Sequence, residues 1–412
     1  MARNILRGSF KLMKSINRSL ILNIIRERGP ISRAEIAKLT KLTPPTVSSL
    51  VKELLLAEIV IELSLGESSG GRKPTLLTLN EEMFHVVGMD IGSQNLKIIL
   101  TSITGKILNK LVYPIPDRSS SDELLSLMKE SIRSVIAGSG VDVENVVGIG
   151  VGMHGIVDVD QGASIFAPNL NLQNIPIKDE LEKEFNMIVK VENDGRAMSL
   201  GELWFGNGAG LDSFVCMNVG LGIGAGIIIN GRLYHGNHFI SGEIGHMVID
   251  IDGPQCTCGN YGCLQTFASG PAIVESVKKE MRLGEATLLS EMTDGNLEDL
   301  TGELIYEAAL KGDSLAKNTL QQAGRYLGVG ITNLIHTVNP RRIIIGGGVS
   351  NAGDFLMESI IQTVNQRALT QPAKQTEIML SKFGEDATAM GAVALILAEL
   401  FTSRNSERAA AH

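Results

Sequence analysis

Four potential metal ligands lie close together in this sequence, and they constrain its fold more than any other feature. Three of the four cysteines fall within eight residues, and a histidine stands ten positions before the first of them. The set is His246, Cys256, Cys258 and Cys263. Three thiolates and one imidazole complete a tetrahedral shell with no open position for water, so the pattern predicts a structural Zn²⁺ site. Free thiols or a disulfide in a loop are the alternatives, and a disulfide needs an oxidising compartment.

Length and composition favour a multi-domain α/β protein without a membrane segment. A chain of 412 residues is expected to form two or three domains. Hydrophobic residues make up 44% of the sequence and aromatic residues 4%, which suits aliphatic cores. We find no apolar run of the ~20 residues that cross a bilayer, and no apolar stretch typical of a secretion signal at the N-terminus. We therefore expect a cytoplasmic protein with no membrane partner.

Charge divides the sequence into a basic head and an acidic body. Residues 1–80 carry 13 Lys and Arg against 6 Asp and Glu, a net charge of +7. The remaining residues carry 24 basic and 39 acidic side chains, a net charge of −15. This asymmetry suggests that only the head meets a polyanion. Chance clustering at a terminus is the alternative, so the head has to be judged by its pattern.

The basic head has the spacing of three helices. Apolar residues recur at helical spacing over 16–25, and Gly29-Pro30 ends that helix. Ser32 and Glu35 form a capping box that begins a second helix. Thr43 can cap a third helix, whose first turn holds two prolines. The expected buried stripe of this third helix is Val47, Leu50, Val51, Leu54 and Leu55. Two helices, a short turn and a third helix form a helix-turn-helix unit.

The third helix would be the recognition helix, because polar side chains near its N-terminus can reach base edges or phosphates. These side chains are Thr46, Ser48, Ser49 and Lys52. Two strand-like runs, 59–65 and 75–79, then flank a glycine-rich segment typical of the wing of a winged helix-turn-helix. The wing presents Arg72 and Lys73, which suit a narrow minor groove. A three-helix interaction module with solvated polar residues is the alternative.

The body contains two strand–glycine turn–strand hairpins. The first is expected at 85–101 and the second at 214–230. Such hairpins cradle phosphate in nucleotide-binding proteins of the actin and sugar-kinase type, and two of them indicate two similar lobes around a cleft. A Rossmann dinucleotide site is disfavoured, because a strand and not a helix follows the glycines at 220–226. The expected domains are a DNA-binding head (1–80), a first lobe (81–200, completed by 385–401) and a second lobe (201–384).

Polar residues between the hairpins suit a small hydroxylated ligand. They lie in Pro168–Asn171, after the strand-like run 146–152, in Glu192–Asp194 and in Ser241–Glu243. Amides and carboxylates without an obvious counter-cation are what vicinal sugar hydroxyls require, since each hydroxyl both donates and accepts. Helix caps and turns favour the same residue types, so each residue taken alone has this second explanation.

Together these residues resemble the ROK family of repressors and sugar kinases, over about residues 17–400. The most specific stretch runs from Gly242-Glu243-Ile244-Gly245-His246 to Cys263. The resemblance implies an α/β fold: a winged helix-turn-helix followed by a two-lobed sugar-kinase-like body, of the actin-like ATPase and ribonuclease H-like class. The winged head points to the repressor branch of the family, and within it to the xylose repressors of Gram-positive bacteria.

The resemblance also implies a set of sugar contacts. They are Asn169, Asn193, Asp194, Glu243, His246 and Gln265. Gln265 stands where the family has glutamate, so its amide keeps the reach, adds a donor and loses the charge. His246 would be both a zinc ligand and a sugar neighbour, and the metal would shape a pocket instead of doing chemistry. In the family's kinases, Asp194 would be the general base.

The phosphate loops depart from the kinase pattern of the family. Ser93 and Gln94 stand where kinases have glycine and threonine, and Leu221 replaces a threonine in the second loop. These changes place side chains and apolar bulk where phosphate would meet backbone and hydroxyl groups. The loop at 346–348 keeps the family's glycines. We therefore expect a protein that is not an enzyme.

The sequence thus predicts a sugar-responsive transcriptional repressor, a homodimer or tetramer that leaves a palindromic operator when a monosaccharide effector closes the lobes. Xylose is the effector that the resemblance favours, and glucose, other hexoses and N-acetylated sugars stay open. An ATP-dependent sugar kinase with a DNA-binding head is the alternative, which Asp90 and Asp194 support. An activator is a third possibility, because the sign of regulation depends on the position of the operator.

Overall fold

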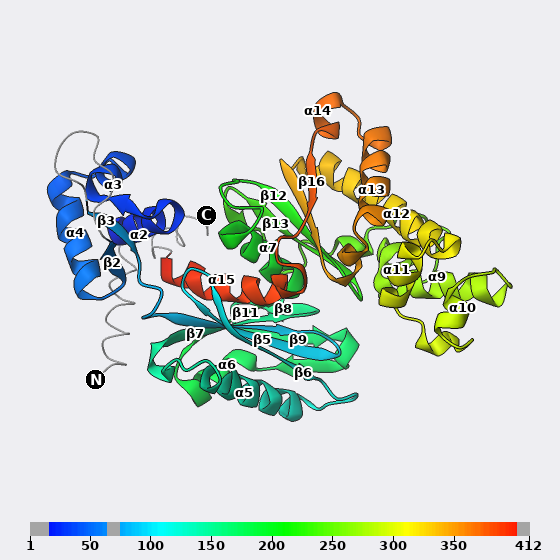
Figure 1. Ribbon diagram of the computed structural model, residues 1–412, viewed down its shortest axis with the longest axis horizontal. Coiled ribbons are helices and arrows are strands. Elements are labelled where there is room, and N and C mark those ends of the chain that lie inside the picture. The colour runs from blue at the N-terminus through cyan, green and yellow to red at the C-terminus, as the bar shows by residue number, and fades with distance from the viewer. Residues whose placement is uncertain (1–15, 64–74, 402–412) are drawn as a thin grey trace. The chain divides into compact units, whose positions relative to one another are not determined.

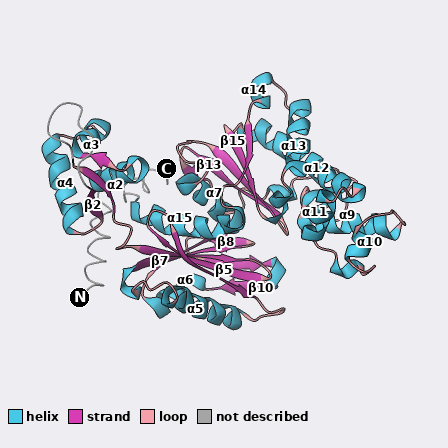
Figure 2. Ribbon diagram, viewed as in Figure 1, coloured by secondary structure: helices cyan, strands magenta, loops and turns pink. Residues whose placement is uncertain are grey.

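The computed structural model describes residues 16–63 and 75–401 (Figure 1). The chain forms two compact units, one of residues 1–192 with 392–412 and one of residues 193–391. Each unit contains its own five-stranded sheet with helices on its faces (Figure 2). None of the helices in the described part of the chain combines the length and apolar character that a membrane span needs. The α/β class expected from the sequence is confirmed.

The N-terminal part of the first unit is a three-helix head with a small sheet of strand order β1-β3-β2. Its elements are α2 (Ile16–Arg28), β1 (Ile31–Ser32), α3 (Arg33–Thr40), α4 (Pro44–Leu56), β2 (Val60–Leu63) and β3 (Leu76–Leu79). The expected capping box is present, with the side chains of Ser32 and Glu35 each bonded to the other's backbone N–H. The Thr43 side chain caps α4 as expected, by accepting a hydrogen bond from the N–H of Thr46.

The core of the head is formed by aliphatic side chains from all three helices and from β3. The fully buried members are Ile21, Leu22, Ile36, Val47, Val51, Leu54 and Leu77. The expected stripe of α4 is therefore buried at Val47, Val51 and Leu54, whereas Leu50 and Leu55 are half-buried. This geometry is that of a winged helix-turn-helix, in which α3 and α4 are the helix pair and β2 and β3 flank the wing. The wing residues, 64–74, lie outside the described residues.

The sheet of the first unit has the strand order β11-β7-β4-β5-β6. The strands β4, β5 and β6 form an antiparallel meander, and β7 pairs parallel with β4. The elements of this lobe are β4 (His85–Ile91), β5 (Asn95–Ser102), β6 (Ile107–Pro114), α5 (Ser121–Ala137), η1 (Val143–Asn145), β7 (Val146–Met153), β8 (Ile156–Asp158), β9 (Ala163–Ala167), η2 (Pro168–Leu170), β10 (Leu172–Ile175), α6 (Ile177–Phe185) and β11 (Ile188–Asn193). The first hairpin expected from the sequence is thus β4–β5.

The C-terminal helix α15 (Ala387–Phe401) packs against the sheet of the first unit, as its alanine-rich sequence indicates. A Cβ built at Gly150 of β7 would lie 1.8 Å from the carbonyl oxygen of Ala392, so only glycine permits this approach. Gly148 likewise faces Ile396. The helices α5 and α6 cover the opposite face of the sheet (Figure 1).

The turn Pro168–Leu170 comes after β7, as expected, and two strands of the small antiparallel sheet β10-β9-β8 lie between them along the chain. The turn is a single 3₁₀ turn between β9 and β10, and Asn171 continues it in a left-handed conformation (φ 53°). The sequence did not reveal β8 and β9 because these strands are short and lack a clear alternation of apolar residues.

The sheet of the second unit has the strand order β14-β13-β12-β15-β16, and β12 is antiparallel to β13 but parallel to β15. Its strands are β12 (Phe214–Val219), β13 (Ile223–Ile229), β14 (Arg232–Leu233), β15 (Arg342–Gly346) and β16 (Glu377–Leu380). Its helices are α7 (Asp194–Phe205), α8 (Gln265–Ala268), α9 (Gly270–Arg282), α10 (Leu289–Met292), α11 (Gly302–Leu310), α12 (Ser314–Val338), α13 (Asp354–Arg367) and α14 (Gln371–Lys374). Short 3₁₀ turns are η3 (Ile244–His246), η4 (Leu297–Asp299), η5 (Gly348–Ala352) and η6 (Gly384–Asp386).

Candidate functional site

The four potential metal ligands converge at one point of the second unit. Their ligand atoms, three sulfurs and one imidazole nitrogen, all lie within 4.8 Å of one another. His246 ends the turn η3, and the three cysteines follow in the connection to α8. The tight return to Cys263 depends on Gly262 (φ 67°), because a Cβ there would lie 1.4 Å from the carbonyl oxygen of Asp250.

The spacing of the ligand atoms fits a tetrahedral metal ion. Sγ of Cys256 lies 3.6 Å from Nδ1 of His246, and Sγ of Cys258 lies 3.8 Å from Sγ of Cys263. With metal–sulfur bonds of about 2.3 Å and a metal–nitrogen bond of about 2.0 Å, tetrahedral geometry separates sulfur from nitrogen by about 3.5 Å and two sulfurs by about 3.8 Å. The donor set therefore matches a metal ion both in kind and in separation.

The close approach of the three thiols shifts the pKa values of two of them in opposite directions. Burial, together with the neighbouring Cys256 and Cys258, raises the pKa of Cys263 to about 12. Burial also opposes ionisation of Cys256, but hydrogen bonds, chiefly from Cys258, lower the pKa of Cys256 to about 6. Three adjacent thiolates repel one another, so they can all be ionised near neutral pH only beside a positive charge.

The imidazole of His246 connects the cysteine cluster to Glu243. Its Nδ1 faces Cys256, while its Nε2 lies 4.0 Å from Oε2 of Glu243. A metal bound at Nδ1 would leave the proton on Nε2, so this edge of the ring would be a donor. Burial raises the pKa of Glu243, whereas His246 and Arg196 lower it and Asp194 raises it. Asp194, Glu243 and His246 are therefore close enough to interact electrostatically.

Asn193 and Asp194 lie at the N-terminus of α7. Oδ1 of Asn193 accepts a hydrogen bond from the N–H of Arg196 at 3.2 Å and caps the helix. This cap is the second explanation that the sequence left open for Asn193. Oδ2 of Asp194 accepts a hydrogen bond from Nδ2 of Asn218 at 3.1 Å. Asn218, at the end of β12, was not selected from the sequence, where it is one polar residue in an apolar strand.

Arg196, which is 1% exposed, is a further residue of this region that the sequence pattern does not predict. Its Nη1 donates to the carbonyl oxygen of Phe239 at 2.7 Å and to that of Ser241 at 3.4 Å. Phe239 has a φ of 57°, a left-handed conformation that is uncommon for this residue type. Because these carbonyls lie just before Glu243, Arg196 anchors the Glu243 loop to α7. A charged residue just after Asp194, in a segment rich in small and apolar residues, is the signal that could have indicated this role.

Gln265 lies at the start of α8, beside the four potential metal ligands. Its Nε2 donates a hydrogen bond to Sγ of Cys256 at 3.2 Å. Its Oε1 faces two glycines: a Cβ built at Gly245 would lie 3.0 Å from this oxygen, and a Cβ at Gly222 would lie 3.5 Å from it. The amide is therefore placed between the cysteine loop and the β12–β13 turn. Five of the six expected sugar contacts belong to the second unit, and the sixth, Asn169, is an exposed residue of η2 in the first unit.

Both glycine turns expected to cradle phosphate are present as β-hairpin turns. In the first unit, the N–H of Gly92 donates to the carbonyl oxygen of Asn95 at 3.0 Å. In the second unit, the N–H of Gly220 donates to the carbonyl oxygen of Gly222 at 2.9 Å. Leu221, between these two glycines, has a 52% exposed side chain, which offers no hydrogen bond to a phosphate.

The residues expected to reach DNA lie between positions 46 and 52 of α4, which spans Pro44–Leu56. Ser48, Ser49 and Lys52 are exposed, and Thr46 is half-exposed with its hydroxyl 2.8 Å from that of Thr43. These positions leave the side chains accessible to a DNA groove. Arg72 and Lys73 of the expected wing lie outside the described residues.

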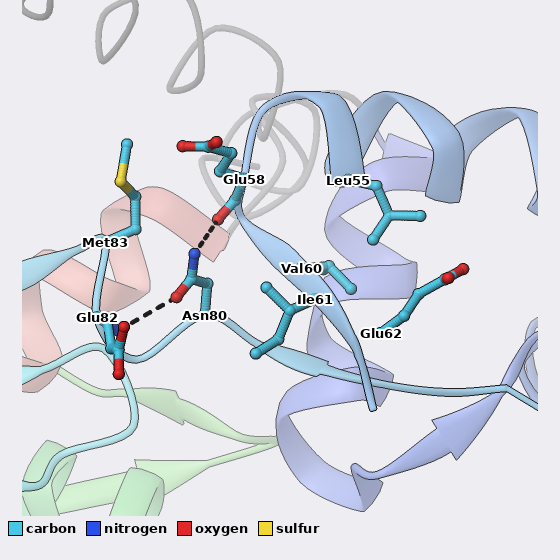
Figure 3. Close-up of a pocket in the computed structure, with 8 residues that line it drawn as sticks. All are labelled: Leu55, Glu58, Val60, Ile61, Glu62, Asn80, Glu82 and Met83. Atoms are coloured by element: carbon cyan, nitrogen blue, oxygen red, sulfur yellow. Dashed lines mark hydrogen bonds between the residues drawn. The ribbon is translucent and has the colours of Figure 1, made fainter. Parts of the chain in front are cut away.

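A surface groove of about 730 Å³ lies on the head, where the end of α4 meets β2 and the segment after β3 (Figure 3). The side chain of Asn80 joins two segments of the groove wall. Its Nδ2 donates to the carbonyl oxygen of Glu58, and its Oδ1 accepts from the N–H of Glu82. The residues that line it are Leu55, Glu58, Val60, Ile61, Glu62, Asn80, Glu82 and Met83. Among the described residues, the lining contains none of the expected sugar or metal residues and none of the expected DNA residues of α4.

Comparison with known proteins identifies both parts of the chain. The profile of the ROK family matches residues 86–399, and a profile described as winged helix-turn-helix DNA-binding matches residues 15–61. The chain is 32% identical to the xylose repressor of Caldicellulosiruptor bescii, over 96% of this chain and 98% of that protein. It is 31% identical to the N-acetylglucosamine repressor of Escherichia coli O6:H1, over 94% of each chain.

Two solved structures resemble this chain, one over nearly its whole length and one over about three quarters of it. A ROK family transcriptional regulator, described as a homologue of the E. coli MLC protein, matches with a TM-score of 0.81 and 31% identity, over 96% of this chain and 97% of that one. A ROK family glucokinase from Streptomyces griseus, in complex with glucose and AMPPNP, matches with a TM-score of 0.68 and 30% identity. This match covers 76% of this chain and 98% of the glucokinase chain.

Proposed function

The chain belongs to the ROK family, and we propose that it is a transcriptional repressor whose winged head binds operator DNA and whose body binds a monosaccharide effector that causes release. One observation carries this proposal: Asp194, Glu243 and His246 gather in a body that shares its chain with a helix-turn-helix head. The relatives named as repressors span both parts, whereas the glucokinase covers 76% of the chain. A sugar kinase needs no DNA-binding head.

We further propose that the cysteine cluster holds a structural Zn²⁺ ion, with His246, Cys256, Cys258 and Cys263 as its ligands. Four protein ligands leave no position for a reactive water, so the ion would supply a fixed cross-link and positive charge. The cross-link holds η3 in place. Glu243 and Nε2 of His246 then face a ligand from a rigid turn, and an effector pays less ordering entropy on binding.

The polar groups of this region suit sugar hydroxyls. The carboxylates of Asp194 and Glu243 accept hydrogen bonds, and Nε2–H of His246 donates one, so a hydroxyl can use both of its capacities here. Xylose is the first candidate because of the C. bescii relative, and N-acetylglucosamine is the second because of the E. coli relative. The proposed contacts at Asn169, Asn193 and Gln265 rest on resemblance to the family.

Release of DNA requires the effector to distinguish between two states of the protein. An effector that bound the DNA-bound and free forms equally would shift nothing, however tightly it bound. We propose that the sugar binds more tightly to the form with low operator affinity. A palindromic operator would need two heads, so we also propose a homodimer or a tetramer of such dimers.

Phosphoryl transfer is the second candidate function, and the similarity to a glucokinase and the retained Asp194 favour testing it. A kinase base must take a proton from the sugar hydroxyl. Here the amide of Asn218 occupies one oxygen of Asp194, and the turn at Leu221 offers an apolar side chain. We therefore propose that the chain binds the sugar without phosphorylating it. ADP release above background in the presence of ATP and a sugar would contradict this proposal.

A screen of monosaccharides tests the proposed function. The full-length protein is heated with xylose, glucose or N-acetylglucosamine, and the sugar that raises the melting temperature is then added to the protein–operator complex. We expect that sugar to release the operator at concentrations near its dissociation constant. Glu243→Gln is the matched control. We expect this variant to bind the operator but not to release it when the sugar is added. Release by every sugar alike, or by none, would count against the proposal.

A further inference from the structure

Gln265 contacts the metal-ligating residues through a hydrogen bond that a carboxylate in its place could not make. Its Nε2 donates to Sγ of Cys256 at 3.2 Å, and this sulfur lies 3.6 Å from the imidazole nitrogen of His246. Cys256 is 4% exposed, so water has little access to its sulfur. A buried thiolate is stabilised by each N–H group that points at it, and Gln265 supplies such a group from a side chain.

The other end of the same amide faces two backbone turns. A Cβ built at Gly245, directly before His246, would lie 2.2 Å from the carbonyl oxygen of Ile223 and 3.0 Å from Oε1 of Gln265. A Cβ built at Gly222, in the turn between β12 and β13, would lie 3.5 Å from the same Oε1. Gln265 therefore fills the space between the cysteine loop, the turn η3 and the β12–β13 hairpin. A side chain in this position can transmit the geometry of the metal centre to the hairpin turn.

We propose that Gln265 is a positioning residue of the metal centre, which orients the Cys256 thiolate and joins it to the β12–β13 turn. This inference rests on the proposed metal site and is independent of the proposed repressor activity. It also gives a physical reason for glutamine at this position. A glutamate would offer only acceptors at neutral pH, and it would bring a negative charge beside a thiolate that already has thiolate neighbours.

The rate of zinc loss tests the proposal directly. Full-length protein loaded with zinc is mixed with the chromogenic chelator 4-(2-pyridylazo)resorcinol, and the absorbance of the zinc–chelator complex is followed. We expect Gln265→Met to release zinc about 10- to 100-fold faster than the unmodified protein, since loss of a hydrogen-bonding partner of a metal ligand typically has this effect. Gln265→Glu should release zinc at least as fast as Gln265→Met, because it also adds a like charge.

Gln255→Met is the matched control, because it makes the same substitution next to Cys256 at an exposed position. Its zinc release should equal that of the unmodified protein. A cobalt-loaded sample gives a second readout that packing alone would not move. Loss of the N–H donor raises the energy of the sulfur lone pairs, so the sulfur-to-cobalt charge-transfer band of Gln265→Met should shift to longer wavelength.

The outcomes separate two failures. An unmodified protein that retains no zinc and gives no thiolate–cobalt band would overturn the metal site itself. A protein that retains zinc, but whose Gln265→Met variant has the same release rate and the same cobalt spectrum, would overturn the role of Gln265. Faster release with an unchanged cobalt band, and an equal fall in melting temperature with and without zinc, would reduce Gln265 to ordinary packing and also overturn the proposal.

Discussion

The two five-stranded sheets of this protein have the same topology but different connections. In each unit a three-stranded antiparallel meander is extended by strands added beside its first strand: β6-β5-β4-β7-β11 in one and β14-β13-β12-β15-β16 in the other. The third strand of the meander leads to the next helix through residues 115–120 in the first unit. In the second unit the same step takes residues 234–264, which include η3 and the whole cysteine cluster.

The longer connection of the second unit is the one that carries residues of the proposed functional site. A long connection with little regular structure has to be ordered by something other than strand or helix hydrogen bonds. Arg196 orders part of this connection by donating to the carbonyls of Phe239 and Ser241, and we attribute further order to the proposed metal cluster. The connection that needs them also carries Glu243 and His246. The short connection of the first unit, residues 115–120, contains no cysteine, histidine or glutamate.

The largest expected effect comes from removing one of the proposed metal ligands. Cys258→Ser should release the metal and abolish the effector response, because the connection 234–264 loses its cross-link, while operator affinity changes little. Operator binding titrated with and without the effector measures both properties. Serine at the buried fourth cysteine, Cys216, is the control for loss of a thiol elsewhere in the unit. A metal-free Cys258→Ser protein with a normal response would break the link between this connection and function.

The next effect concerns Asp194, the carboxylate of α7 that interacts with Glu243 of the connection 234–264. Asp194→Asn should weaken effector binding by about 10- to 100-fold, because a strong acceptor for a sugar hydroxyl is replaced by a neutral amide. Isothermal titration calorimetry with the effector found by the screen measures this change. Asp212→Asn, a substitution of an aspartate outside the site in the same unit, should bind the effector normally. Equal affinity of all three proteins would remove Asp194 from the effector site.

An intermediate effect is expected in the head of the first unit. Replacing both Arg72 and Lys73 with alanine should weaken operator binding at every sequence and lower the salt slope by about 2, since each phosphate contact contributes about one. Binding measured over a range of salt concentrations gives the slope. The effector affinity of this variant should be unchanged. An unaltered slope would show that the wing makes no phosphate contacts.

A smaller effect is expected at a helix cap of the second unit. Burial raises the pKa of Asp313, but hydrogen bonds from the N–H groups of Ala316 and Leu288 and from the Thr287 hydroxyl lower it more, so its net direction is downward. A lowered pKa in the folded state stabilises the protein above the ordinary carboxyl range, and this contribution is lost as the pH falls through the folded-state pKa. Asp313→Ala should cost about 1–2 kcal/mol at neutral pH. The loss should shrink in acid, as urea unfolding at several pH values would show.

The smallest effect is expected at a helix cap of the first unit. Ser120 and Glu123 form the capping box of α5, and Ser120→Ala should cost about 1 kcal/mol. Hydrogen exchange then sharpens the comparison of the two units. If they open separately, Ser120→Ala should speed exchange only in the first unit and Asp313→Ala only in the second. Faster exchange throughout the chain in both variants would show a single cooperative unit.

Much of the fold follows from local patterns. The caps at Ser32 and Thr43, the prolines that open α4 and the two glycine hairpins are all visible in the sequence because neighbouring residues determine them. The four-ligand cluster is visible for the same reason, since its cysteines are only a few residues apart. The small sheet β10-β9-β8 was missed because its strands are short and lack alternation.

The sequence alone determined the class of this protein, its winged head and the residue types of its potential metal-binding cluster, because each depends on spacing along the chain. Only the tertiary structure decided which atoms meet. It placed the Gln265 amide against Cys256, the Asn218 amide against Asp194, and the buried Arg196 beneath the Glu243 loop. These contacts join residues from separate strands, helices and loops. Their geometry is therefore set by how the sheet and helices pack, and no local pattern encodes it.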